Sequence, residues 1–236
     1  MNAKFSAKCV ALIAAGAMSM SLAACSGGSM DDSSSSSAKA SGDSITIGTV
    51  TTNSGTAAAY GEAEVKGFEL AVSEINAKGG INGKKVKLES MDDKGDATEA
   101  SNAFNKLAGD NSVLGVVGPT ISSTTAAVAP LADQSKLPAI APAATSDSIE
   151  TGGYMFRTCF KDSYQGEIAA KFAAETLKVK KVAVLYGTGD PYSSGVGKAF
   201  AAAAKKAGLA VPALPDFDPA NPAAFVKGLG ERAIFS

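Results

Sequence analysis

Hydroxyl-bearing residues follow an apolar run at two places in the chain. At the first, Gly118–Thr125 contains Ser122 and Ser123 and leads directly into a predicted helix. Backbone N–H groups and serine hydroxyls at the start of a helix form a neutral site for an anion such as a carboxylate. Ser122 could equally be an ordinary N-cap, whose side chain satisfies one of the same N–H groups. The segment by itself leaves both interpretations open.

The second polar turn, Pro142–Ser146, follows the apolar run Leu137–Ala141. The hydroxyl of Thr145 could donate to the same carboxylate, and the main-chain carbonyl of Ala143 could accept a hydrogen bond from an ammonium group. The two turns would then hold both charged ends of an α-amino acid. Taken alone, this segment is also an ordinary turn between two elements.

A third loop, Gly187–Gly195, is rich in glycine and follows the apolar run Lys181–Tyr186. Its spacing matches neither the G-x-G-x-x-G nor the G-x-x-x-x-G-K-[ST] phosphate-binding loop. The loop therefore argues against nucleotide binding.

The chain has 236 residues and no histidine. This excludes Ser-His-Asp and Cys-His catalysis as well as histidine metal sites, and no G-x-S-x-G elbow surrounds Ser122 or Ser123. The net charge of −1 provides no basic field for nucleic acid. We therefore expect no enzyme, no metal, no other cofactor and no nucleic-acid partner.

The three cysteines are Cys9, Cys25 and Cys159. Cys159 is the only one outside the N-terminal region, so we expect no disulfide framework. We interpret Cys159 as a small buried apolar residue. A nucleophilic role would need a neighbouring base that the sequence does not supply.

Short apolar runs alternate with amphipathic segments from Ser44 onward. The expected strands cover residues 45–50, 84–90, 113–117, 137–141, 181–186 and 209–214. The expected helices cover residues 61–78, 97–109, 122–135, 163–178, 194–206 and 222–229. This alternation predicts an α/β fold with a parallel sheet and helices on both faces. Ligands of such sheets bind at the carboxyl ends of the strands, where the polar turns fall.

The N-terminus has the pattern of an export signal. Lys4 and Lys8 precede the apolar run Val10–Leu22, which is too short to span a bilayer. The sequence Leu22-Ala23-Ala24-Cys25 resembles the bacterial lipobox. Residues 1–25 are therefore expected to be a lipoprotein signal peptide together with its lipidated residue, Cys25. An ordinary signal peptide with an incidental cysteine is the alternative.

Residues 26–42 are rich in serine and contain the run Ser33–Ser37. Such a segment buries too little apolar surface to order itself, so we predict a flexible linker. The protein is then attached to the cell membrane through its lipid, on the extracytoplasmic (periplasmic or cell-surface) face.

Motifs spread over residues 44–225 carry a family resemblance. The most specific is Asn76–Gly83, with the sequence Asn-Ala-Lys-Gly-Gly-Ile-Asn-Gly, and the next is Ala141–Thr145. Shorter matches are Ile45–Gly48, Ser54-Gly55, Tyr60-Gly61, Asp92-Asp93, Asp96, Val117-Gly118, Ser122-Ser123, Arg157-Thr158, Asp162-Ser163, Gln165-Gly166, Tyr192 and Gly195. Together they resemble the branched-chain amino acid (Leu/Ile/Val-type) binding proteins of ABC transporters, which have the type I periplasmic binding protein fold.

The resemblance implies two doubly wound parallel-sheet lobes, with the chain ending inside the second lobe. Residues 43–160 would form the first ligand-binding lobe, which is incomplete, and residues 161–236 a truncated second lobe. The ligand-binding residues that the resemblance implies are Ser122, Thr145, Ala143, Tyr60, Tyr192 and Asp162. The serine and the threonine would hold the ligand carboxylate, and the alanine carbonyl would take the ammonium. The tyrosines would wall the side-chain pocket from each lobe, and the aspartate would lie near the hinge.

The function implied is a lipid-anchored substrate-binding protein that captures branched-chain or other apolar amino acids, such as leucine, for an ABC transporter permease. The family pattern continues beyond Ser236 and would supply an acidic residue for the ammonium. We therefore expect weak or no amino-acid binding by the chain as written. Two alternatives stay open: a truncated, non-binding lipoprotein remnant, and a receptor for an amide or urea-type solute.

Overall fold

The computed structural model describes residues 44–150, 152–212 and 223. Its sheet consists of β1 (Ser44–Thr51), β2 (Lys85–Asp92), β3 (Val113–Val117), β4 (Ala139–Ala141) and β5 (Met155–Arg157). The strand order is β2-β1-β3-β4-β5, and every pair is parallel. The predicted α/β fold with a parallel sheet is confirmed. The short strand β5 was not predicted.

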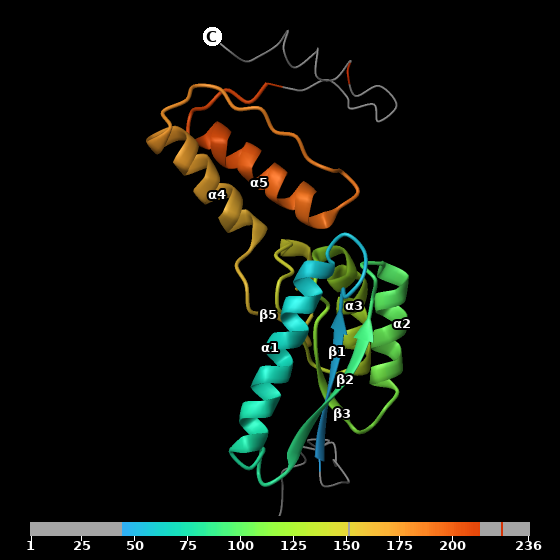
Figure 1. Cartoon of the computed structure of the whole chain (residues 1–236). Coiled ribbons are helices and arrows are strands. Elements are labelled where there is room, and N and C mark those ends of the chain that lie inside the picture. Colours follow the sequence, from blue (N-terminus) through green and yellow to red (C-terminus); the bar gives the residue numbers. More distant parts are fainter. Residues whose placement is uncertain (1–43, 151, 213–222, 224–236) are drawn as a thin grey trace, which may run out of the picture. The chain divides into compact units, whose positions relative to one another are not determined.

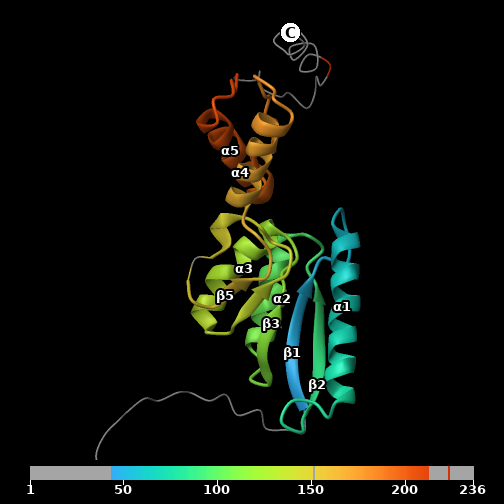
Figure 2. The same ribbon diagram turned by 90° about the vertical axis from the view of Figure 1, so that its left-hand side faces the viewer.

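Three helices connect the first four strands (Figure 1). They are α1 (Ala58–Ala77), α2 (Ala97–Ala108) and α3 (Ser122–Ser135). Figures 1 and 2 show α1 on one face of the sheet and α2 on the other, where it packs against α3. The carboxylate of Asp96 caps α2 by accepting hydrogen bonds from the N–H groups of Thr98 and Glu99. Helices therefore cover both faces, as the alternation predicts.

A hydrophobic core lies between the sheet and the helices α2 and α3. Its largest fully buried side chains include Phe104 and Leu107 from α2, Val50 from β1 and Val128 from α3. Burying each such side chain contributes roughly 1.5–3 kcal/mol. The core holds the carboxyl ends of the strands in one rigid layer, from which the connecting turns project.

The chain continues through η1 (Asp147–Ile149) and β5 into α4 (Asp162–Lys171), the π-helical turn η2 (Phe172–Thr176) and α5 (Pro191–Lys206). Helices α4 and α5 pack side by side (Figure 1). A second, smaller buried cluster consists of Ala170 from α4, Ala173 from η2, Ala204 from α5 and Leu209, which follows α5. No helix in the described part of the chain is both long and apolar enough to cross a membrane.

The predicted strand over residues 181–186 is wrong. The described residues form only an isolated parallel bridge between Lys181 and Ala210, with a hydrogen bond from the Val182 N–H to the Ala210 carbonyl at 2.9 Å. An apolar segment becomes a strand only by pairing along its length, and here the pairing stops after one position. The strand predicted over 209–214 contributes this same bridge and then leaves the described residues. The leader, Cys25, the linker and most of the helix predicted over 222–229 also lie outside them.

Candidate ligand-binding pocket

A pocket of about 420 Å³ lies at the carboxyl ends of the strands. Its lining residues are Ala57, Tyr60, Thr120, Ile121, Ser122, Ala143, Thr145, Phe160, Gln165, Asp190 and Tyr192. They come from the start of α1, the β3–α3 turn, the turn after β4, the connection between β5 and α4, and the α4–α5 part of the chain. Five of the six residues expected to bind the ligand therefore lie around one pocket. Asp162 is the exception.

The turn between β3 and α3 brings the first of these residues into place. Gly118 has a φ of +120°, and a Cβ there would collide with the Val50 carbonyl, so only glycine fits. A cis peptide bond joins Gly118 to Pro119. The chain then enters α3, whose N-cap is Ile121.

Ser122 is the first residue of α3 and is nearly buried. Ile121, and not Ser122, occupies the N-cap position, so the interpretation of Ser122 as an N-cap is wrong. Thr125 is the first residue whose N–H reaches a helical carbonyl, that of Ile121 at 3.0 Å. The N–H groups before it have no partner within the helix. Ser122, which carries one of these N–H groups, lines the pocket. These N–H groups and the Ser122 hydroxyl suit an anion.

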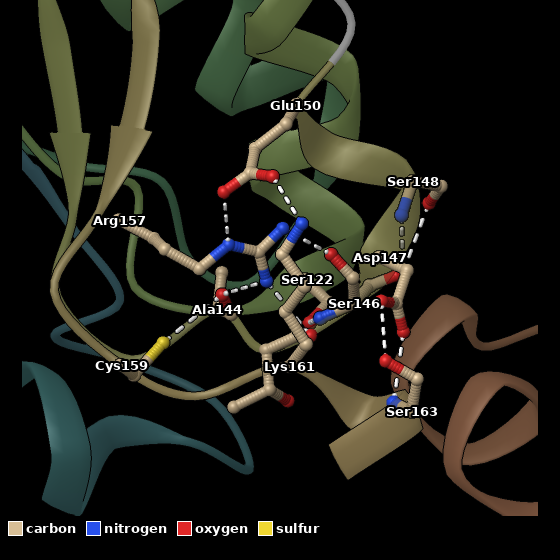
Figure 3. A network of polar contacts seen from close by, with 11 residues as sticks. Ser122, Ala144, Ser146, Asp147, Ser148, Glu150, Arg157, Cys159, Lys161 and Ser163 are labelled. Atoms are coloured by element: carbon tan, nitrogen blue, oxygen red, sulfur yellow. Dashed lines mark hydrogen bonds and ion pairs between the residues drawn. The ribbon is translucent and has the colours of Figure 1, made fainter. Parts of the chain in front are cut away.

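The second turn is tied to the first. The Ser146 N–H donates a hydrogen bond to Oγ of Ser122 at 3.2 Å, as Figure 3 shows. This bond occupies a lone pair of the hydroxyl and leaves its proton to be donated elsewhere. Thr145, next to Ser146, is nearly buried but lines the pocket.

Arg157 stabilises the second turn by hydrogen bonds to its carbonyl groups (Figure 3). Its guanidinium donates to the carbonyls of Thr145 and Ser146, each at 2.8 Å, and to that of Ala144 at 3.4 Å. The guanidinium also pairs with Glu150 at 2.8 Å, and its side chain is only 5% exposed. The Arg157 and Lys161 side chains hydrogen-bond to Glu150 and keep the pKa of that carboxyl below its ordinary value. The rigid fork of arginine suits this cluster of carbonyls.

Asp162 does not line the pocket. The residue is fully buried and its N–H donates to the Thr145 carbonyl at 2.9 Å. Neither carboxylate oxygen has a hydrogen-bond partner of normal geometry. Burial raises the pKa of Asp162, helped by the Asp147 and Asp190 carboxylates and opposed by the nearby Thr145 hydroxyl and Arg157 guanidinium. Direct ligand contact by Asp162 stays a prediction.

A chain of buried hydrogen bonds fixes Thr120, which sequence reasoning missed as a lining residue. Its Oγ accepts from the Thr52 N–H at 3.0 Å and donates to Glu64 at 2.6 Å. Thr52 in turn donates its hydroxyl to Asp93 at 2.6 Å. Burial raises the pKa of Glu64; the Thr120 hydrogen bond lowers that pKa and the Asp93 carboxylate raises it. Such contacts between distant residues leave no local signal in the sequence.

Aromatic rings form the apolar part of the pocket. Tyr60, Phe160 and Tyr192 line it and are 65%, 56% and 42% exposed. The Gln165 side-chain amide donates to the Tyr192 hydroxyl at 3.3 Å. Large exposed rings gathered in a concave site suit an apolar ligand group.

Cys159 is half-buried rather than buried, so that prediction is corrected. Its thiol donates to the Ala144 carbonyl at 3.2 Å, and burial raises its pKa. The thiol is therefore in its protonated, unreactive form near neutral pH. Among the residues that the structure describes, no cluster of metal-ligating side chains could hold a metal ion.

A family model described as a periplasmic binding protein matches residues 44–229, so the chain belongs to the periplasmic binding protein family. This family consists of solute-binding proteins and not of enzymes. The match confirms the predicted periplasmic binding protein family.

Curated relatives point to the same family. The chain is 37% identical over 167 residues to the Leu/Ile/Val-binding protein BraC3 of Rhizobium johnstonii, covering 70% of this chain and 45% of that protein. It is 35% identical over 164 residues to the Leu/Ile/Val-binding protein of Escherichia coli K12, covering 69% and 44%. The chain thus spans about half the length of the curated relatives it matches.

Solved structures confirm the fold. The branched-chain amino acid transporter substrate-binding protein LivJ of Streptococcus pneumoniae, in complex with isoleucine, matches with a TM-score of 0.68 and 38% identity. That match covers 78% of this chain and 53% of LivJ. The leucine-binding protein LivK of Thermotoga maritima matches with a TM-score of 0.66 and 29% identity, covering 71% and 47%.

Proposed function

We propose that this chain supplies the ligand pocket of a receptor for branched-chain or other apolar α-amino acids, which delivers them to an ABC permease. The observation that carries the proposal is that Ser122, Thr145 and Ala143 line one pocket. Similarity to proteins named for Leu, Ile and Val binding supports this ligand class.

The ligand carboxylate would accept hydrogen bonds from the N–H groups that open α3 and from the hydroxyls of Ser122 and Thr145. The ammonium, on the other side of the ligand α-carbon, would donate to the Ala143 carbonyl. An apolar side chain would lie against Tyr60 and Tyr192. The mechanism is capture by these groups followed by closure of the second lobe, with no covalent step.

The two-lobe division at residues 43–160 and 161–236 remains part of the proposal. Its support is the separation between the core of Val50, Phe104 and Val128 and the smaller cluster of Ala170 and Ala204. We further propose a lipid anchor at Cys25 and a linker over 26–42, which would keep the receptor beside its permease. Metabolic labelling with a fatty acid should label the protein and should fail for Cys25→Ser.

Amide NMR during titration with leucine tests the proposed ligand, because it detects weak as well as tight binding. We expect saturable shifts concentrated at Ser122–Thr124 and at Thr145. Isoleucine and valine should compete, whereas acetamide and urea should not. Shifts caused by the amides but not by leucine would replace the proposal with the amide-type receptor. A spectrum that none of these solutes changes would favour the non-binding lipoprotein.

A further inference from the structure

One face of α4 carries a row of large apolar side chains. Tyr164 and Ile168 in α4 and Phe172, at the junction of α4 and η2, follow one another at four-residue spacing, so they share one side of the helix. The three residues are 59%, 47% and 52% exposed. Single exposed apolar residues are ordinary on a protein surface, whereas a continuous row of large ones is typical of an interaction surface. We call these three residues the apolar row.

The apolar row is not the face through which α4 packs on its own chain. Ala170 is buried, and it belongs to the smaller cluster that α4 shares with α5. Ile168 and Phe172 each lie two residues from Ala170, which is about 160° around a helix with 3.6 residues per turn. Helix α4 therefore has one buried face and, opposite to it, an apolar face that no other part of the described chain covers.

A groove of about 480 Å³ between α4 and α5 borders the apolar row. Six of its eleven lining residues are alanines, and Glu167 and Lys171 are among the other five. These two charged residues directly precede Ile168 and Phe172 in the helix, so the groove and the row are neighbours on the surface. Large side chains beside a groove lined by small ones form a surface that can interlock with a copy of itself.

The charges beside the apolar row are self-complementary in one orientation. Glu167 is exposed and forms no ion pair with any described residue, and Lys171 makes only a long, exposed contact with Glu175 at 4.0 Å. An antiparallel pair of α4 helices, with a two-fold axis at Ile168, brings Glu167 of each copy within one helical turn of Lys171 of the other. A parallel pair would set glutamate against glutamate and lysine against lysine. The charges therefore favour the antiparallel pair.

We propose that a second copy of this chain binds to the apolar row, so that two copies associate through antiparallel α4 helices. Tyr164 of each copy lies opposite Phe172 of the other, and these large side chains pack into the alanine-lined groove of the second copy. The interface is isologous, so the assembly closes at two copies. One helix pair forms a small interface, and we expect a weak dimer whose population depends on concentration. The residues of this surface do not line the ligand pocket, so the inference is independent of the proposed function.

Sedimentation velocity of the purified chain over an about hundredfold range of concentration measures the association. We expect monomer and dimer but no larger species. Ile168→Lys places two like charges at the two-fold axis and should weaken the dimer at least about a hundredfold. Leu70→Lys is the matched control, because Leu70 is a 62% exposed residue of α1 outside this surface. It should leave the dimer unchanged.

Charge reversal tests the antiparallel orientation. Glu167→Lys or Lys171→Glu alone sets like charges against each other across the axis and should weaken the dimer about three- to tenfold. The double substitution Glu167→Lys with Lys171→Glu restores opposite charges, so it should restore the affinity to within about twofold of the wild type. Single reversals that leave the dimer unchanged would overturn the antiparallel arrangement.

A chain that stays monomeric over the whole concentration range would overturn the proposal. A dimer that Ile168→Lys and Leu70→Lys weaken equally would also overturn it, because the contact would then not be at α4. All the variants should keep the wild-type melting temperature within a few degrees, since the changed side chains are exposed. A monomer that Ile168→Lys destabilises would show instead that the apolar row is covered by residues of the same chain outside the described part.

Discussion

The hydrogen bond from the Ser146 N–H to Oγ of Ser122 joins the two turns that line the pocket, although the residues are 24 positions apart in the chain. Both residues are buried, so the bond is protected from water. It sets the distance between the start of α3 and the Ala143–Thr145 turn. The site that we propose for the two ends of an amino acid would therefore be assembled before the ligand arrives.

We predict that Ser122→Ala lowers both stability and ligand affinity. The substitution leaves the buried Ser146 N–H without its acceptor, which costs about 1–3 kcal/mol. It also removes the hydroxyl that we propose donates to the ligand carboxylate. Urea denaturation and leucine titration measure the two effects.

Ser123→Ala is the control for this substitution, because Ser123 is next in α3 but does not line the pocket. It should change stability by less than about 0.5 kcal/mol. Equal losses from both substitutions would show that the Ser122–Ser146 bond is not what joins the turns.

We predict that Arg157→Lys loosens the Thr145 turn. An ammonium cannot reproduce the fork that reaches three carbonyls and Glu150. We expect a loss of about 2 kcal/mol in unfolding free energy and weaker leucine binding, measured by urea denaturation and calorimetry. Lys161→Ala removes an exposed partner of the same glutamate and should cost under about 1 kcal/mol. A lysine at 157 that preserves stability would contradict the role given to the guanidinium.

Sequence reasoning succeeded where the signal is local. The run Ser122–Ser135 and the apolar stretch Val113–Val117 were predicted with the bounds that the structure has. It failed for β5, because Met155–Arg157 is too short for a period to emerge. It also failed for residues 181–186, because whether an apolar run pairs as a strand depends on neighbours elsewhere in the chain.

In the pocket, too, residues with a local sequence signal could be predicted, and residues without one could not. The turns that carry Ser122 and Thr145 follow apolar runs and could be found from the sequence. Thr120 and Asp190 could not, since their roles depend on Glu64 and on the place of α5 in space. Asp190 followed by Pro191 has the local pattern of a helix start, but the helix was predicted only from Ser194, three residues after α5 begins.

We predict that Glu64→Gln stabilises the protein at neutral pH. Because the pKa of Glu64 in the folded protein is above its ordinary value of 4.5, the folded state binds the proton more tightly than the unfolded state. Stability from this group is therefore full below pH 4.5 and is lost as the pH rises through the raised pKa. Glutamine keeps an acceptor for the Thr120 hydroxyl and carries no charge.

The measurement is the melting temperature across this pH range. The variant should melt a little higher than the wild type at pH 7, and the difference should disappear at pH 4. Glu62→Gln, an exposed change on the same helix, is the control and should leave the pH profile as it is. A variant that loses stability at pH 7 would mean that Glu64 is held charged in the folded protein.

Two helical glycines should respond in opposite ways to alanine. In α5, a Cβ on Gly195 would come within 2.6 Å of Oδ2 of Asp162, which is fully buried. In α1, a Cβ on Gly67 would meet nothing within 4 Å. Gly195→Ala should therefore destabilise the protein by about 1–3 kcal/mol, whereas Gly67→Ala should stabilise it by about 0.5–1 kcal/mol through helix propensity. Denaturation of the two variants under one condition makes the comparison, and a stabilising Gly195→Ala would show that α5 does not press on Asp162.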